Sequence, residues 1–259
     1  MAQKKCRVLL DGDILLYRNC HVVEKLFTWS EDLHTLVSDS REARERMQAD
    51  VADIVAKVAA AGVNVGRQTL VFSGPNNWRK VLYPEYKANR LASRKPIAFG
   101  PVKQWFLENT DSALWDNLEA DDAMGILSTN PKNLAIIVSA DKDMKTIPGL
   151  LMNPDKDVFP VEISVADANY HHMVQTLTGD ATDHYPGCPG VGPVGAEKIL
   201  NAVPREDPGA MWAAVVAAYA KAGLDEAAAT VQAKLARILR HGDWDFKKGR
   251  MLWSPPRIS

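Results

Sequence analysis

The chain has 259 residues, of which 46% are hydrophobic and 24% charged, so it can bury a sizeable core in one or two domains. Lys and Arg number 31 and Asp and Glu 32, so overall charge does not indicate a nucleic-acid partner, although an acidic site could face a basic groove. Three cysteines without a CxxC spacing argue against a disulfide framework or a zinc site. The polar N-terminus and the lack of a long apolar run predict a cytoplasmic protein without signal peptide or membrane span.

Short apolar segments in the first part of the chain predict buried strands. They are Arg7–Leu10, Thr69–Phe72 and Leu134–Ser139, with Leu150–Met152 as a candidate fourth. A helix is predicted over Glu42–Ala61, where apolar residues recur at helical spacing and Gly62 can cap the end. Such alternation is typical of an α/β fold with a mostly parallel sheet covered by helices on both faces. Asp11 and Asp141 directly follow two of the strands, at the carboxyl edge where such sheets bind ligands.

The character of the sequence changes near residue 165. A stretch dense in glycine and proline covers residues 179–195, and an alanine-rich region with helical character follows over 209–240. We therefore expect an α/β domain over residues 1–165 and an all-helical region over 166–259.

Acidic residues fall in four short motifs, LLDGD, LEADD, SADKD and GDATD. Each motif alone is more simply explained as a turn or a helix start, where carboxylates are common. Together they would repel one another unless cations neutralise them, and an oxygen-only ligand set suits Mg²⁺ or Mn²⁺. Two such ions are the usual machinery for phosphodiester displacement. The acidic residues concerned are Asp11, Asp13, Glu119, Asp121, Asp122, Asp141, Asp143, Asp180 and Asp183.

A basic segment with interleaved aromatic residues covers residues 78–105. Its cations are Arg79, Lys80, Lys87, Arg90, Arg94, Lys95 and Lys103. Composition alone leaves two interpretations open: a solvated basic face, or a surface for single-stranded DNA, whose phosphates pair with cations while its bases stack on aromatic rings.

A glycine motif at Gly190, Gly192 and Gly195 formally matches a dinucleotide-binding fingerprint. No predicted strand precedes it, and Pro186 and Pro189 stand just upstream, so the context is wrong for that fold. A hairpin between two helices, whose backbone amides hold a DNA phosphate beside Lys198, explains the motif better.

Five segments in order make a resemblance specific enough to state. The chain resembles the flap-endonuclease and 5′-to-3′ exonuclease family, especially the short 5′-to-3′ exonucleases of podoviruses. The matching segments run from Val8 to Leu200 and read VLLDGD, NWRKVLYPEYKANR, LEADDAMGIL, VSADKDMKTIP and GDATDHYPGCPGVGPVGAEKIL.

The resemblance implies a PIN-like nuclease domain with a short helical arch around residues 79–105, and a helix–three-turn–helix around 177–200. It implies two divalent ions, Mg²⁺ or Mn²⁺. A first ion would be bound by Asp11, Glu119 and Asp121, and a second by Asp141, Asp143 and Asp183, with Asp180 nearby. Asp122 and Asp13 would be outer ligands or structural neighbours.

The resemblance also implies how DNA binds. Lys87 and Arg90 would contact the scissile phosphate, Tyr86 would be a stacking platform, and Arg94 and Lys95 would contact the strand within the arch. Gly190, Gly192, Gly195 and Lys198 would grip the duplex without reading its sequence, together with a monovalent cation such as K⁺. The expected partners are DNA with 5′ ends, flaps, nicks or gaps, and secondarily RNA–DNA hybrids, bound by a monomer.

One position departs from the family pattern, in which an aspartate commonly follows the second strand. Here that place is taken by Gly74, and Asp13 or Ser73 would have to substitute through water. The main alternative hypothesis is therefore a non-catalytic DNA-binding relative with a decayed metal site. A PIN-type ribonuclease toxin is a second alternative, against which the GDATD and GVGPVG segments argue.

Overall fold

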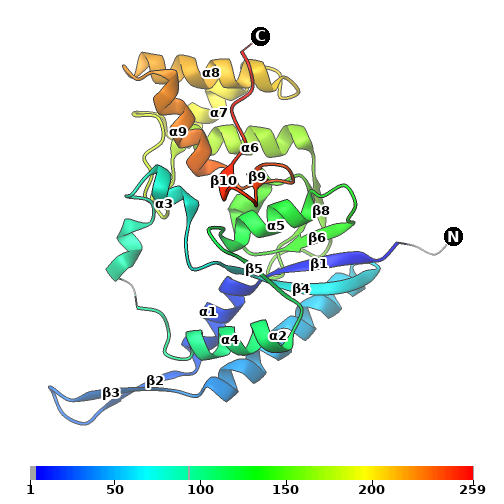
Figure 1. The fold of residues 1–259 in the computed structure, drawn as a ribbon, viewed down its shortest axis with the longest axis vertical. Coiled ribbons are helices and arrows are strands. Elements are labelled where there is room, and N and C mark those ends of the chain that lie inside the picture. The colour runs from blue at the N-terminus through cyan, green and yellow to red at the C-terminus, as the bar shows by residue number, and fades with distance from the viewer. Residues whose placement is uncertain (1–3, 93, 259) are drawn as a thin grey trace.

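The computed structural model describes residues 4–92 and 94–258. At its centre lies a six-stranded sheet in the order β5-β4-β1-β6-β7-β8 (Figure 1). The edge strand β8 (Val161–Ile163) runs antiparallel to its neighbour. The other strands run parallel to one another and are β1 (Cys6–Asp11), β4 (Val65–Ser73), β5 (Ser112–Trp115), β6 (Ala135–Val138) and β7 (Gly149–Met152).

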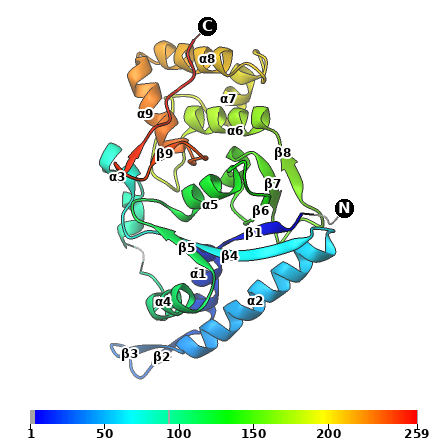
Figure 2. The same ribbon diagram turned by 45° about the vertical axis from the view of Figure 1, so that its right-hand side comes forward.

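Helices cover both faces of this sheet (Figures 1 and 2). The alternation of side chains along β1 shows why: Val8 and Leu10 belong to one buried cluster and Leu9 to another. The first cluster is completed by α1 (Gly12–Val22), α2 (Ser40–Ala60) and α4 (Phe99–Asn109). The second is completed by α5 (Ala120–Ser128) and the short 3₁₀ helix η2 (Lys142–Thr146).

A helical region with its own core follows the sheet. Its helices are α6 (Val165–Thr178), α7 (Pro193–Leu200), α8 (Pro208–Lys221) and α9 (Glu226–Ala236). Trp212 and Tyr219 are fully buried at its centre. The region lies on the α5 side of the sheet, where α6 contacts η2 (Figure 2).

Two further segments complete the chain. The basic segment forms α3 (Trp78–Leu82) and the 3₁₀ helix η1 (Ala88–Ala92) before it reaches α4. A ribbon of β2 (Glu24–Thr28) and β3 (His34–Ser38) projects from the body beyond α1 and α4 (Figure 1). Near the C-terminus, β9 (Trp244–Asp245) pairs with β10 (Arg250–Met251). In the described parts of the chain, no helix is both long and apolar enough to pass through a membrane.

The predicted α/β fold with a mainly parallel sheet is confirmed, and the four predicted strands correspond to β1, β4, β6 and β7. The prediction missed the β2–β3 ribbon, β5 and β8. The region after residue 165 is not wholly helical, because β9 and β10 lie in it. Helix α6 begins at Val165, with Ser164 as its N-cap, but a division into two domains stays a prediction.

Candidate active site

Two carboxylates stand at the ends of adjacent parallel strands. Asp11 ends β1 and caps α1 by accepting a hydrogen bond from the Ile14 amide at 3.1 Å. Its second oxygen accepts from the Ser139 hydroxyl at 2.9 Å, and Ser139 directly follows β6. Asp141 follows two residues later and caps η2 by accepting from the Asp143 amide at 2.8 Å. Strand pairing thus brings together residues that lie 130 positions apart in the sequence.

A third segment reaches the same place through the start of α5. Glu119 occupies the N-cap position without capping the helix through its side chain, which leaves the carboxylate available for other partners. The Ser73 hydroxyl, at the end of β4, accepts from the Ala120 amide at 3.0 Å and so ties α5 to the sheet. Asp121 lies in the first helical turn, where acidic residues interact favourably with the helix dipole.

The loop after α6 supplies the fourth segment. Asp180 accepts from the amides of Thr182 and Asp183, which makes a tight turn that directs Asp183 toward the basic segment. One cavity of about 320 Å³ collects all four segments. Its acidic lining residues are Asp11, Asp13, Glu119, Asp121, Asp141, Asp143, Asp180 and Asp183.

Several of these carboxyl groups are costly to ionise where they stand. Burial raises the pKa of Asp11 to about 6, against which the Ile14 and Ser139 hydrogen bonds act. Burial, with nearby Asp141 and Asp180, raises the pKa of Asp143 to about 7. Burial, followed by Asp11 and Asp141, raises the pKa of Asp121 well above its ordinary value. Burial and the neighbouring carboxylates thus both oppose the ionisation of these three groups.

Glu119 behaves differently from its neighbours. Burial would raise the pKa of its carboxyl group, but Lys87 and Arg79 together lower it to about 2. The Lys87 ammonium donates a hydrogen bond to Glu119 Oε1 and lies 3.4 Å from Asp183 Oδ2. Arg90 donates to Asp183 Oδ1 at 2.6 Å and is more exposed than Lys87. The two cations proposed to contact phosphate thus stand at the edge of the acidic cavity.

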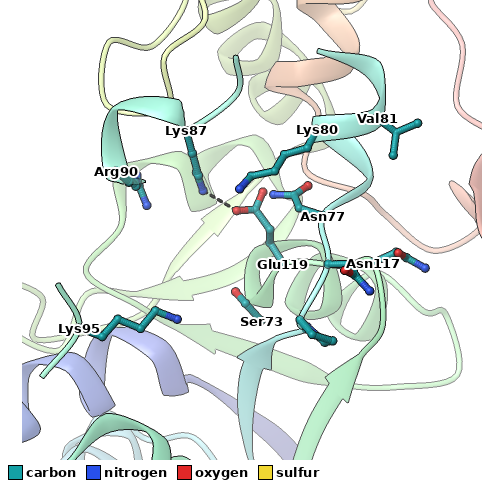
Figure 3. Close-up of a pocket in the computed structure, with 12 residues that line it drawn as sticks. Ser73, Asn77, Lys80, Val81, Lys87, Arg90, Lys95, Asn117 and Glu119 are labelled. Atoms are coloured by element: carbon teal, nitrogen blue, oxygen red, sulfur yellow. Dashed lines mark hydrogen bonds and ion pairs between the residues drawn. The ribbon is translucent and has the colours of Figure 1, made fainter. Parts of the chain in front are cut away.

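A second cavity of about 660 Å³ opens beside the first and shares Ser73, Lys87, Arg90 and Glu119 with it. Figure 3 shows Lys87 directed at Glu119, with Lys80, Arg90 and Lys95 around the same opening. Acidic and basic surfaces therefore meet at the Lys87–Glu119 pair. That arrangement suits a ligand with negative charge that must reach an acidic site.

Of the two roles expected for Asp122, outer ligand or structural neighbour, its surroundings favour the structural one. Asp122 is 0% exposed and does not line the cavity. Its oxygens accept from Arg79 at 2.7 and 2.8 Å, from the Trp78 indole at 3.1 Å and from the Leu239 amide at 3.1 Å. With both oxygens fully engaged by the protein interior, Asp122 is a structural residue.

Tyr86 is also placed otherwise than expected. Its side chain is 2% exposed and its ring lies against Tyr185, so it offers no face on which a base could stack. Its hydroxyl donates to Asp183 at 2.7 Å and contacts Glu119 at 3.0 Å. Tyr86 therefore links two cavity carboxylates and is not a stacking platform.

The structure explains why residue 74 is a glycine. A Cβ atom at this position would lie 2.2 Å from the Trp115 carbonyl oxygen, so the approach of β4 to β5 excludes any side chain. Asp13 stands next to it, accepting from the Ser73 amide at 2.9 Å, with the Lys103 ammonium 4.0 Å away. Lys103 also donates to the Ser73 carbonyl at 2.7 Å. Asp13 also lines the acidic cavity.

Arg94 and Lys95 lie in the part of the basic segment between η1 and α4. Arg94 makes a two-pronged ion pair with Glu24 of β2, at 2.8 Å from both guanidinium ends, and Glu24 also accepts from the Ile97 amide. A DNA phosphate would have to compete with Glu24 for Arg94. Lys95 borders both the cavity of Figure 3 and a cleft of about 660 Å³ that runs toward Tyr17.

The glycine motif forms the turn that leads into α7. Gly190 has a φ of +77°, a conformation that a residue with a side chain adopts only with strain. Gly192 is the N-cap of α7 and Pro193 follows, so the N-cap residue offers no side-chain acceptor to the first amides of the helix. Gly195 lies in the first turn of this helix, and the exposed Lys198 lies in its last turn.

Sequence reasoning did not single out Arg79 or Lys142. Arg79 was grouped with the exposed cations, although it is 3% exposed and bonded to Glu119. Lys142 lines the acidic cavity, 4.0 Å from Asp180, and its place between the aspartates of SADKD was the signal available.

Divalent cations fit this site in chemistry. The lining donors are hard carboxylate oxygens, and a nearby cation would favour the ionised forms of Asp11, Asp121 and Asp143, whose pKa values are raised by burial. Within residues 4–92 and 94–258, no three acidic, histidine or cysteine side chains are gathered closely enough to hold an ion as they stand.

Known proteins resemble this chain in sequence and in fold. The exodeoxyribonuclease of Enterobacteria phage T3 is 30% identical, with 96% of this chain and 92% of that protein covered. The flap endonuclease Xni of Shewanella oneidensis is 29% identical over 48% of this chain and 53% of its own length. The crystal structure of the T5 D15 protein with metal ions shares the fold at a TM-score of 0.59 and 14% identity, covering 90% of this chain and 89% of that one. Residues 7–157 match the family described as 5′-3′ exonuclease, N-terminal resolvase-like domain, so the chain belongs to the 5′-3′ exonuclease family.

Proposed function

We propose that this protein is a 5′-to-3′ exodeoxyribonuclease with structure-specific flap endonuclease activity, which hydrolyses DNA phosphodiester bonds to 5′-phosphate products. The observation that carries the proposal is the cavity in which carboxylates from four chain segments meet the cations of the basic segment. Family membership and the phage T3 relative, named an exodeoxyribonuclease, support it.

The proposal includes two divalent cations bound in the acidic cavity. Asp11, Glu119 and Asp121 would hold the first, and Asp141, Asp143 and Asp183 the second, with Asp180 nearby. When bound, such ions activate a water nucleophile and stabilise the leaving oxygen of a phosphodiester. A K⁺ ion near the Gly190–Gly195 turn remains part of the proposal through the family resemblance alone.

The protein's own residues would bind and orient the strand. Lys87 stands where the basic and acidic cavities join, so a phosphate that passes from one to the other meets its ammonium. Arg90, half exposed and beside Asp183, would add a second positive charge on the same side. Both would stabilise negative charge that develops on the phosphate oxygens.

The hypothesis of a decayed, non-catalytic relative is less well supported. Gly74 is required by backbone packing against Trp115, so its lack of a carboxylate does not indicate decay. Asp13 lines the cavity beside Ser73 and supplies a carboxylate in that region.

Cleavage of labelled DNA tests the proposal. Duplexes with a 5′ flap, a nick or a blunt end, each labelled at the 5′ or the 3′ terminus, would be incubated with the protein and Mg²⁺. We expect short products from the 5′ label, long ladders from the 3′ label, and ends that a ligase can join because they carry 5′-phosphates. Degradation from 3′ ends, or products without a 5′-phosphate, would overturn the proposal.

A further inference from the structure

The guanidinium of Arg79 is the most fully engaged cation near the site. It is 3% exposed, and its Nε donates to the Leu235 carbonyl at 3.0 Å. Nη1 donates to Glu119 at 2.9 Å and to Asp122 at 2.7 Å, and Nη2 donates to Asp122 at 2.8 Å and to the Arg237 carbonyl at 2.5 Å. An arginine has five N–H donors in a fixed plane, so every donor has a partner.

These partners come from three separate parts of the chain. Arg79 lies in α3, and Glu119 and Asp122 lie at the start of α5. Residues 235–239 form the end of α9 and the segment after it. Asp122 adds a bond of its own to the Leu239 amide, at 3.1 Å. In both ribbon views α3 lies beside α9, which agrees with their contacts (Figures 1 and 2).

The same guanidinium therefore touches a cavity carboxylate and the backbone of the C-terminal region. Glu119 lines the acidic cavity, whereas the Leu235 and Arg237 carbonyls lie more than 150 residues from Arg79 in the sequence. Trp78, with its ring centroid 4.6 Å from the guanidinium carbon, restricts the plane of the fork further. The position of the Glu119 carboxylate is thus coupled to the seating of residues 235–239.

We propose that Arg79 is a positioning residue, which holds the Glu119 carboxylate toward the cavity and makes its placement depend on the docked C-terminal segment 235–239. The proposal rests on the proposed function, because it assigns Glu119 to a metal-binding set. Lysine cannot replace Arg79 in this role, since a lysine has three donors around one point and no planar fork. Groups that orient a ligand from behind commonly change metal affinity 10–100-fold.

The test compares Arg79→Lys with Arg7→Lys. Arg7 is the control, because it is a partly buried arginine whose Nε donates to the Thr69 hydroxyl at 2.9 Å, and it lies outside both the cavity and segment 235–239. Mn²⁺ binding to the DNA-free protein would be titrated by electron paramagnetic resonance, and unfolding would be followed by circular dichroism. We expect Arg79→Lys to weaken Mn²⁺ binding about 10-fold or more. Arg7→Lys should lose thermal stability but keep its Mn²⁺ affinity within about twofold.

A double-mutant cycle with Glu119→Gln tests whether Arg79 acts through Glu119. Arg79→Lys should change Mn²⁺ affinity much less in the Glu119→Gln background than in the wild type. Equal Mn²⁺ affinity in Arg79→Lys and wild type, or an undiminished effect in the Glu119→Gln background, would overturn the proposal. If Arg79→Lys does not fold, Asp122→Asn takes its place, because it leaves the guanidinium present but removes its charged anchor.

The outcomes also separate this inference from the proposed function. A wild type that binds Mn²⁺ but cleaves no DNA would contradict the function, and the titration would still decide the role of Arg79. A wild type that cleaves DNA with Mn²⁺, beside an Arg79→Lys variant of unchanged affinity, would contradict the inference alone.

Discussion

Asp121 and Asp122 are consecutive in the sequence, yet Asp121 lines the acidic cavity while Asp122 is enclosed by Arg79, Trp78 and Leu239. One turn of α5 thus carries a carboxylate that repels its neighbours and a carboxylate that a buried cation needs. Opposite consequences follow when each loses its charge.

The first prediction compares Asp121→Asn with Asp122→Asn in thermal unfolding and cleavage assays. Asp121→Asn should abolish cleavage but leave the melting temperature in EDTA unchanged or higher, because burial beside Asp11 and Asp141 disfavours its charge. Asp122→Asn should destabilise the protein by about 3 kcal/mol, because the Arg79 charge loses its buried partner. Its cleavage at saturating metal and low temperature should persist. The opposite pattern would mean that the two roles are exchanged.

The second prediction separates chemistry from binding at Lys87. Lys87→Ala should slow single-turnover cleavage at saturating DNA by about 100-fold, because a cation at the scissile phosphate acts mainly on the transition state. The dissociation constant for DNA should change only a few-fold. Arg94→Ala, already paired with Glu24, should instead affect DNA binding more than rate. A wild-type single-turnover rate for Lys87→Ala would reduce Lys87 to a binding residue.

The third prediction concerns the turn before α7. Lys198 is exposed on the last turn of that short helix, so Lys198→Ala should weaken duplex binding equally for all sequences. The slope of binding against salt concentration should fall by roughly one charge. Lys221→Ala, at the end of α8, is the exposed-lysine control and should leave the slope unchanged. A changed base preference in Lys198→Ala would show that the turn reads bases.

The fourth prediction concerns pH and the metal-free protein. Asp143 has a pKa of about 7 in the folded chain, raised from 3.8 by burial. The folded state therefore holds the proton more tightly than the unfolded state between roughly pH 4 and pH 7, and stability falls as pH rises through that window. In EDTA, the wild type should lose on the order of 2 kcal/mol through this group between pH 5 and pH 8.

Asp143→Asn should remove most of that loss, since the amide keeps the volume but cannot ionise. The melting temperature of this variant in EDTA should exceed that of wild type at pH 8 and approach it at pH 5. The measurement is a series of thermal unfolding curves across this pH range. If the melting temperatures of the two proteins change with pH in the same way, folding does not raise the pKa of Asp143.

The sequence alone predicts the part of the site that lies at the ends of strands. Asp11 and Asp141 directly follow apolar strands that pair in parallel, so their approach follows from the sheet alone. Glu119 and Asp183 reach the cavity through a helix start and a loop, and only the family resemblance placed them there. The predicted helix over residues 42–61 corresponds to α2, because its apolar spacing matches a buried stripe.

Other features depend on tertiary contacts that local patterns do not carry. Asp122 and Tyr86 each follow or precede a residue that lines the cavity, Asp121 and Lys87, and only the packing of α3 against α9 reveals that both are buried. The β2–β3 ribbon was missed because it packs against no core, so Leu26, Phe27 and Val37 are exposed and do not alternate with polar residues. The sequence pattern suggested that a carboxylate was lost at Gly74. The contact that explains the glycine involves Trp115, which lies 41 positions away and is not visible in the local sequence.

The central claim is that the cavity carboxylates form a divalent-metal-dependent nuclease site. The most direct test is single-turnover cleavage of a 5′-flap DNA, and of the matching RNA–DNA hybrid, by wild type and Asp141→Asn, in EDTA and after Mg²⁺ addition. We expect no cleavage in EDTA, cleavage by wild type once Mg²⁺ is added, and none by Asp141→Asn, although Asp141→Asn still binds the DNA. Full cleavage in EDTA, or wild-type cleavage by an Asp141→Asn variant, would contradict the account.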